Sequence, residues 1–398
     1  MPTSDRPLLN RALAPFSTGI FGEMSALAVR TGSLNLGQGF PDTDGPQVVL
    51  DAAKAAIDAG HNQYPPAYGI AELRTAIAYH QKDFYQQSLD PDTEILVTTG
   101  ATEALAASLL ALLEPGDEVI AFEPYYDSYV AMISLAGATR RNVTLRAPHF
   151  RPDLDQLRAA INNRTRLILL NSPHNPTGTV FSADELSEIA RLAIEYDLIV
   201  ITDEVYEHLT FDGARHIPLA TLPGMAERTV TISSAGKTFG VTGWKIGWVC
   251  APNAFIEAIR AAKQYLTYVS GAPFQPAAAV GLGLPHEYFE ELAADLQRKR
   301  DRLYTALIDA GLTVFKPQGT YFMTVDVRSV GYQDSLDFCR DLPQRCGVVA
   351  IPSGVFYNDS PQQGKTLARF AFCKQDDVLD EAARRLNSLA GSKPSGDG

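Results

Sequence analysis

With 398 residues, the chain is long enough for about two to three domains, and its 45% hydrophobic and 20% charged residues are typical of a globular protein. The net charge of −12 argues against nucleic acid as a main partner. No run approaches the roughly 18 apolar residues of a membrane helix, and the N-terminus lacks a signal-peptide pattern, so we expect a cytoplasmic protein without a membrane span.

The cysteine and histidine patterns predict neither disulfides nor a metal site. The four cysteines, Cys250, Cys339, Cys346 and Cys373, form no C-x-x-C pair, which fits a reducing compartment. The seven histidines contain no H-E-x-x-H or similar cluster. We therefore expect no metal.

Short apolar runs alternate with helical patterns from about residue 45 to 285. The expected strands cover residues 95–98, 118–122, 166–170, 198–202, 229–233 and 246–250. These runs are continuous, as in strands buried on both faces. Expected helices include residues 102–113 and 183–196, and the second begins with a capping box, Ser182 and Glu185. Strands and helices in alternation predict an α/β fold with a mostly parallel sheet between helices.

The pattern changes at about residue 286, where a long charged helix begins. Strand-like segments at 321–327 and 367–372 and a final helix follow. We expect a large domain over residues 45–285 and a smaller α+β domain over 286–390, which the N-terminal segment 1–44 joins. The tail 391–398 is expected to be disordered.

Polar segments follow the expected strands, and in parallel α/β sheets ligands bind beyond the carboxyl ends of the strands. Taken singly, each segment has an ordinary explanation as a turn, a cap or part of the core. Together they supply backbone N–H groups for a phosphate, an aromatic ring, an acid, a phenol and a lysine. This combination suits pyridoxal 5′-phosphate, an aromatic phosphorylated aldehyde that forms a Schiff base. The segments are T-T-G-A-T-E, E-P-Y-Y-D-S-Y, N-S-P-H-N-P-T-G, D-E-V-Y-E and S-S-A-G-K-T.

Lys237 lies in a Gly-Lys-Thr sequence that also ends the P-loop of nucleotide-binding proteins. A P-loop requires a further glycine at the sixth position before the lysine. That position is Thr231, inside an expected strand. The sequence therefore does not support a P-loop.

The combined motifs resemble the class I aminotransferases of the fold-type I pyridoxal-phosphate enzymes. The likeness runs from about Leu34 to Lys374 and implies a large domain with a mostly parallel, seven-stranded sheet. Within the family, the chain is similar to the kynurenine and glutamine transaminases, and closer to bacterial N-succinyldiaminopimelate aminotransferases. The matching motifs are N-L-G-Q-G-F-P-D, N-Q-Y-P-P, E-P-Y-Y-D-S-Y, N-S-P-H-N-P-T-G, T-D-E-V-Y-E-H-L, S-S-A-G-K-T-F-G-V-T-G-W-K-I-G-W and A-R-F-A-F.

The resemblance implies a catalytic lysine and a set of cofactor contacts. Lys237 is expected to bond to the cofactor aldehyde and, once released, to carry a proton during catalysis. Asp203 is expected beneath the pyridine nitrogen, which its charge keeps protonated. Tyr206 and Asn175 match the residues that bind the ring oxygen O3′, and Tyr126 matches the ring that stacks on the cofactor.

The resemblance also implies a phosphate site and a dimer. Ala101, Thr102, Ser234 and Lys245 are expected around the phosphate, where many relatives have arginine in place of Lys245. Tyr64 matches a tyrosine that reaches the phosphate from the other subunit. A homodimer with shared active sites is therefore expected.

For the substrate, Arg369 matches the arginine that holds the α-carboxylate, a task suited to its planar fork of donors. Gly39 is expected to pass close to the same carboxylate, and Asn175 to contact the substrate as well. Phe21 stands where kynurenine-type enzymes have a tryptophan. Ser270 and Gly271 stand where those enzymes carry an aromatic residue followed by a histidine from the partner subunit, which predicts a roomier pocket.

Three classes of function fit these residues. The lead is transfer of an amino group from N-succinyl-LL-2,6-diaminoheptanedioate to 2-oxoglutarate, a step of lysine biosynthesis; the runner-up is a broad aminotransferase for glutamine, methionine and aromatic amino acids, including kynurenine. A second class is β-elimination from cysteine S-conjugates on the same cofactor. A third is a transcription factor with an aminotransferase-like domain, which is disfavoured because only about 30 residues precede the N-L-G-Q-G motif.

Overall fold

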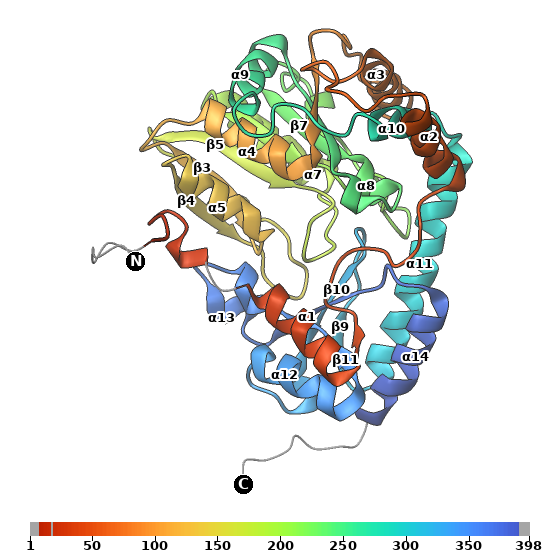
Figure 1. Ribbon diagram of the computed structural model, residues 1–398. Coiled ribbons are helices and arrows are strands. Elements are labelled where there is room, and N and C mark those ends of the chain that lie inside the picture. The colour runs from red at the N-terminus through yellow and green to blue at the C-terminus, as the bar shows by residue number, and fades with distance from the viewer. Residues whose placement is uncertain (1–7, 17–18, 390–398) are drawn as a thin grey trace.

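A seven-stranded sheet forms the centre of the larger part of the molecule (Figure 1). The computed structural model describes residues 8–16 and 19–389, so the predicted tail 391–398 lies outside the described residues. All neighbouring strands are parallel except β8, which runs antiparallel to both of its neighbours. The mostly parallel sheet is thus confirmed. Its order is β2 (Ile95–Thr99), β8 (Ile246–Cys250), β7 (Thr229–Ser234), β6 (Ile199–Asp203), β5 (Thr165–Asn171), β3 (Glu118–Glu123) and β4 (Thr139–Thr144).

Helices cover both faces of this sheet. Side chains alternate across a strand, so Leu167 and Leu169 of β5 pack on one face and Ile168 and Leu170 on the other. This explains the continuous apolar runs in the sequence. The first face packs against α4 (Gly100–Leu112), α5 (Asp127–Leu135) and α9 (Asn253–Lys263), and the second against α6 (Leu154–Ala160) and α7 (Ala183–Glu195).

The expected strands of the large sheet agree with the structure to within about two residues. The strand β4 was not expected, because its sequence T-R-R-N-V-T is polar and half exposed at the edge of the sheet. The capping box of α7 is confirmed, since Ser182 accepts from the Glu185 N–H and Glu185 accepts from the Ser182 N–H.

A four-stranded antiparallel sheet forms the smaller part, in the order β12 (Ile351–Pro352), β13 (Leu367–Ala371), β10 (Phe322–Asp326) and β9 (Thr313–Phe315). It packs with α12 (Ser335–Cys346), α14 (Asp376–Leu386) and the long α11 (His286–Asp309), which runs along one side of the molecule (Figure 1).

The N-terminal segment packs with this smaller part. Its helix α1 (Ile20–Thr31) lies beside α12 and β11 (Val348–Val349) in Figure 1, and β1 (Leu34–Asn35) pairs with β11. These contacts support the expected association of the N-terminal segment with the smaller domain. The domain boundaries themselves stay a prediction.

The remaining helices of the larger part are α2 (Gln47–Asp58), α3 (Ala71–Tyr85) and α10 (Phe274–Leu282), which pack together, and the single turn α8 (Ala235–Thr238). The single turn α13 (Pro361–Gly364) contacts β13 of the smaller sheet. Among the described residues, no helix combines the length and apolar character needed to cross a bilayer.

Candidate active site

A cavity of about 330 Å³ opens at the carboxyl edge of the large sheet. Because β8 is antiparallel, its first residue lies at the edge where β2, β5, β6 and β7 end, and this brings Lys245 into the same cavity. Arg369 enters from β13 of the smaller sheet. Of the predicted cofactor and substrate residues, all except Tyr64 line the cavity: Phe21, Gly39, Ala101, Thr102, Tyr126, Asn175, Asp203, Tyr206, Ser234, Lys237, Lys245 and Arg369.

Lys237 lies on α8, the single helical turn that follows β7. Its amine is 5.9 Å from the ring centres of both Tyr206 and Tyr321, and it forms no ion pair with a described carboxylate. Burial lowers the pKa of Lys237 below that of a free lysine. A larger share of the amine is therefore neutral, which is the form that attacks a carbonyl.

Asp203 ends β6 and is almost fully buried. Its Oδ2 accepts a hydrogen bond of 2.6 Å from the hydroxyl of Tyr129, and its Oδ1 accepts from the Val205 N–H at 3.3 Å. Burial raises the pKa of Asp203, while the bond from Tyr129 favours the charged form. A buried carboxylate held in this way suits a cationic ring nitrogen.

Sequence reasoning missed Tyr129. It lines the cavity, yet in E-P-Y-Y-D-S-Y a tyrosine reads as core. The available signal was its position three residues after Tyr126 at the start of a helix, which places both rings on one face. Their ring centres are 5.8 Å apart in an edge-on arrangement.

The N-terminus of α4 provides a cradle for an anion. Gly100 has a φ of 70°, and free N–H groups of the first turn face outward beside Ala101 and Thr102. A Cβ on Gly247 would lie 2.5 Å from the Gly100 carbonyl carbon, so β8 and α4 touch through their backbones. As a result, Lys245 Nζ lies 3.5 Å from Thr102 Oγ1 at the helix start.

Arg369 is 2% exposed and forms no salt bridge with a described carboxylate. Its guanidinium donates to Asn175 Oδ1 at 3.1 Å and to the Gly37 carbonyl at 3.2 Å, while Nε has no partner. The ring of Phe322 lies 4.0 Å beneath it. Burial lowers the pKa of Arg369 to about 10. A buried cation without an acid is unfavourable until an anion binds, so this position suits a substrate carboxylate.

Gly39 forms part of the cavity wall next to Arg369. A Cβ at this position would lie 2.2 Å from the Phe322 ring, which leaves room only for glycine. The Tyr321 hydroxyl donates to the Gly39 carbonyl at 2.6 Å and fixes this segment.

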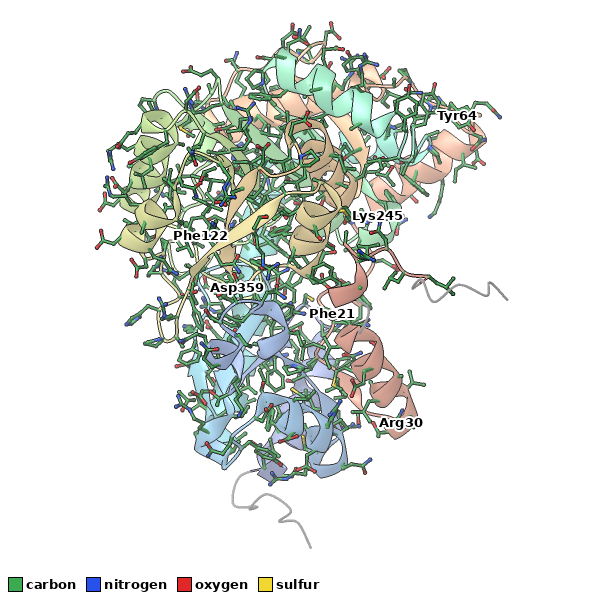
Figure 2. The ribbon with its side chains drawn as sticks, turned by 90° about the vertical axis from the view of Figure 1, so that its left-hand side faces the viewer. Phe21, Arg30, Tyr64, Phe122, Lys245 and Asp359 are labelled. Carbon is green, nitrogen blue, oxygen red and sulfur yellow. The ribbon has the colours of Figure 1, made fainter. Side chains whose placement is uncertain are left out.

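Tyr64 lies outside the cavity and is 79% exposed. Figure 2 shows it at the outer edge of the molecule, apart from Phe21 and Lys245. Its ring contacts only the ring of Tyr268, at 5.5 Å, among the aromatic pairs of the described residues. Within one chain it cannot contribute to the cavity.

The electrostatics of the cavity favour an anionic ligand. Lys237, Lys245 and Arg369 all line it, and none of them forms a salt bridge with a carboxylate in the described part of the chain. The buried acid Asp203 stands among them. This set of groups fits pyridoxal 5′-phosphate: the amine can bond to its aldehyde, the helix N-terminus can bind its phosphate, and the acid can pair with its ring nitrogen.

The family model "Aminotransferase class I and II" matches residues 31–386. The chain belongs to this family. It is a pyridoxal-phosphate-dependent aminotransferase, as the sequence motifs predicted. When bound, the cofactor supplies an electron-withdrawing ring that stabilises negative charge on the substrate Cα.

Similar proteins span nearly the whole aminotransferase chain. A probable N-succinyldiaminopimelate aminotransferase of Mycobacterium tuberculosis is 53% identical, with 95% of this chain and 98% of that protein covered. The solved structure of N-succinyldiaminopimelate aminotransferase from M. tuberculosis gives a TM-score of 0.93 over 96% of this chain and 100% of that one. The methionine aminotransferase of Escherichia coli is 41% identical over 97% of this chain and all of that protein.

Tyr129→Phe should raise the pKa of Asp203, because the variant lacks the hydrogen bond that favours the charged carboxylate. The acidic limb of kcat/KM should therefore move to higher pH, and kcat at neutral pH should fall about tenfold. Initial rates across the pH range measure both effects. Tyr125→Phe is the matched control, since its buried hydroxyl lies 3.4 Å from Asn142 and makes no bond to Asp203. Identical pH profiles for the two variants would contradict the role given to Tyr129.

Proposed function

We propose that this aminotransferase moves an amino group from N-succinyl-LL-2,6-diaminoheptanedioate to 2-oxoglutarate. The observation that carries the substrate is the 53% identity, over 95% of the chain, with a probable N-succinyldiaminopimelate aminotransferase. Ser270 and Gly271, which were expected to leave space for a long acylated side chain, do not line the cavity within one chain, so their role in substrate choice stays a prediction. The reaction is a step of lysine biosynthesis.

The cavity supports a role for each of its polar residues. We assign Arg369 to the α-carboxylate of both substrates in turn, because it is buried and has no acidic partner among the described residues. Its bond to Asn175 Oδ1 holds the guanidinium toward the cavity. Lys237 then carries the proton that leaves the substrate Cα, since its depressed pKa lets the neutral amine act as a base.

The remaining residues hold the cofactor in this proposal. Asp203 keeps the pyridine nitrogen protonated, and Tyr206 and Asn175 bind O3′. Tyr126 stacks on the ring. Ala101, Thr102, Ser234 and Lys245 bind the phosphate at the N-terminus of α4, where backbone donors and the helix dipole both favour an anion.

The runner-up substrate class is supported by the aromatic wall of the same cavity, which Phe21, Phe40, Tyr126 and Phe322 provide. Relatives named methionine aminotransferase and, from Dictyostelium discoideum, kynurenine–oxoglutarate transaminase are 41% and 38% identical. Such a wall would favour methionine or kynurenine over the succinylated donor, which carries three carboxylates. β-Elimination from cysteine S-conjugates would use the same lysine.

Relative kcat/KM decides between these substrates, because specificity resides in that ratio. With 2-oxoglutarate as acceptor, the succinylated diamine should exceed methionine, glutamine and kynurenine by at least tenfold. Pyruvate release from a cysteine S-conjugate should be slower still. A higher kcat/KM for kynurenine or methionine would overturn the proposed substrate and leave the aminotransferase chemistry in place.

We further propose a homodimer in which each chain completes the other's site. Tyr64 contacts the ring of Tyr268, and Tyr265 and Leu266, just before Tyr268 in the chain, are exposed as well; the exposed fractions of Tyr64 and Tyr265 are 79% and 89%. Clustered exposed aromatic rings are typical of interaction surfaces. A second copy seated there would cover the rings and let Tyr64 reach the phosphate end of the neighbouring cavity.

Mixing Lys237→Ala chains with Tyr64→Ala chains should restore activity, because each heterodimer then holds one native site. Random exchange makes half of the dimers mixed, so about a quarter of wild-type activity is expected if Tyr64→Ala alone is severely impaired. Mass spectrometry of the intact dimers confirms exchange. Exchange without recovered activity would contradict shared sites.

We propose that the enzyme works in the cytoplasm. All four cysteines are buried and free, which fits a reducing compartment.

A further inference from the structure

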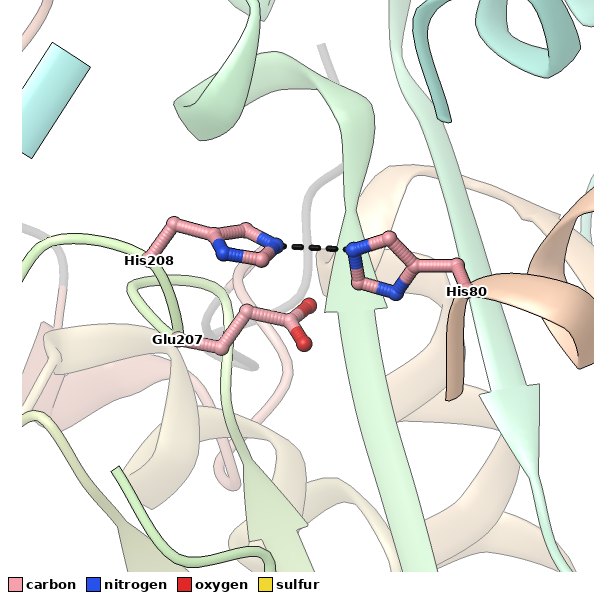
Figure 3. A group of neighbouring side chains, drawn as sticks. All are labelled: His80, Glu207 and His208. Atoms are coloured by element: carbon pink, nitrogen blue, oxygen red, sulfur yellow. Dashed lines mark hydrogen bonds between the residues drawn. The ribbon is translucent and has the colours of Figure 1, made fainter. Parts of the chain in front are cut away.

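Outside the cavity, the fold brings together three residues that could ligate a metal: His80, Glu207 and His208 (Figure 3). His80 lies on α3, whereas Glu207 and His208 lie in the loop after β6, which carries Tyr206 and begins after Asp203, the last residue of β6. One ligand atom from each residue lies within 4.8 Å of the other two. His80 and His208 are 128 residues apart in the chain, so no sequence spacing could reveal the cluster.

Glu207 is a buried carboxylate without a matching cation. It is 5% exposed, and its Oε1 accepts a hydrogen bond of 2.6 Å from Ser233 Oγ. Its Oε2 is buried and forms no hydrogen bond to a described residue, and no described lysine or arginine pairs with it. One oxygen of this buried carboxylate is therefore left without a donor or a cation among the described residues.

The two histidines face each other through ring nitrogens. In a hydrogen bond between two ring nitrogens one of them must be an unprotonated acceptor, which is the form that binds metals. Their Nε2 atoms lie 2.8 Å apart, as the dashed line in Figure 3 marks, and His80 Nδ1 is buried without a partner.

The neighbouring groups that the structure describes supply no cation to Glu207. The nearby His216 is engaged by Glu204, with 2.8 Å between its Nε2 and Glu204 Oε2. Tyr85 interacts with Glu207 through its hydroxyl, a neutral group that adds no positive charge. A buried carboxylate in such surroundings is unfavourable unless a cation binds next to it.

We propose that His80, Glu207 and His208 bind one divalent transition-metal ion, with Zn²⁺ as the best match. Two imidazole nitrogens and one carboxylate oxygen form a common donor set of zinc sites, and a water molecule would complete the tetrahedron. The ion replaces the hydrogen bond between the rings. Zn–N distances near 2.0–2.1 Å place two ligand atoms about 3.4 Å apart, so the rings must separate by roughly 0.6 Å.

A metal ion at this position would join α3 to the loop after β6. Glu207 follows Tyr206 directly, and Tyr206 and Asp203 line the cofactor cavity. The site is therefore structural: it fixes the loop that carries Tyr206 and follows Asp203, without touching the substrate. Because the ion binds the folded chain, added Zn²⁺ should raise the thermal midpoint of unfolding.

The test uses the full chain with its cofactor bound, any affinity tag removed and metals stripped by a chelator. The protein is dialysed to equilibrium against ZnCl₂, and its metal content is measured by inductively coupled plasma mass spectrometry. We expect one Zn²⁺ per chain at micromolar free zinc. Glu207→Gln and His208→Gln should each weaken binding by at least tenfold. The matched control is His286→Gln, since this histidine pairs with Asp83 outside the cluster and its loss should leave zinc binding unchanged.

X-ray absorption of the zinc-loaded protein should show nitrogen and oxygen ligands with imidazole scattering, which separates this site from adventitious binding. Wild-type protein that binds no zinc, or binds it as well as Glu207→Gln does, would overturn the proposal. The cluster would then be a hydrogen-bonded pair of histidines beside a buried acid. If a variant fails to fold, the zinc content and ligand signature of the wild-type protein decide the question alone.

Discussion

Lys237→Ala should lower kcat on the order of 10⁴-fold or more, because the variant loses both the nucleophile and the proton carrier. The protein should still fold and bind the cofactor non-covalently. The other contacts of the cavity, at Asp203, Lys245 and the start of α4, remain in place. Single-turnover kinetics with excess enzyme measure the loss of chemistry free of any change in substrate affinity.

Lys54→Ala is the matched control for this variant. Lys54 is exposed on α2 and, among the described residues, pairs only with Asp51, so its loss should leave kcat unchanged. A Lys237→Ala enzyme that keeps more than a small fraction of wild-type turnover would show that another group carries the proton.

Arg369→Lys should lower kcat/KM roughly 10²- to 10³-fold for both the amino acid and the 2-oxo acid, since truncating one partner of a buried charged pair costs several kcal/mol. Lysine keeps the charge but not the planar fork that can grip a carboxylate through two bonds. The lysine side chain is also shorter than that of arginine and has a single nitrogen, so it should lose the contacts to Asn175 and the Gly37 carbonyl. Most of the loss should appear in KM.

The control is Arg328→Lys, a change of the same chemistry in the smaller part of the molecule. Arg328 is exposed and pairs with Asp326, and neither residue lines the cavity. Its kinetics should match those of the wild-type enzyme. A loss confined to one of the two substrates in Arg369→Lys would contradict a shared carboxylate site.

The large sheet was predictable because its strands are buried on both faces. Residues such as Ile168 and Leu169 point to opposite faces, so both must be apolar and the run stands out in the sequence. The edge strand β4 has no such constraint. Its arginines interrupt the apolar pattern from which a strand would be predicted. The antiparallel direction of β8 could not be predicted from the sequence either, because an apolar run carries no information on strand direction.

Most cavity residues were predictable because the cofactor demands particular chemistry at particular strand ends. Lys237 and Asp203 each follow an expected strand, and the family resemblance brought in Arg369 from the distant smaller sheet. Contacts between ordinary-looking residues were not predictable. Tyr129 reads as core until the fold sets it against Asp203, and His80 reads as an isolated histidine until α3 sets it beside Glu207.

The central claim is that the cofactor is held covalently by Lys237 in the resting enzyme. Borohydride reduction of the protein as isolated, followed by protease digestion and mass spectrometry, tests it most directly. The account predicts a pyridoxyl-phosphate adduct on the peptide that contains Lys237, and none on that peptide in Lys237→Ala protein treated in parallel. An adduct on Lys245 or on any other lysine, with Lys237 unmodified, would contradict it.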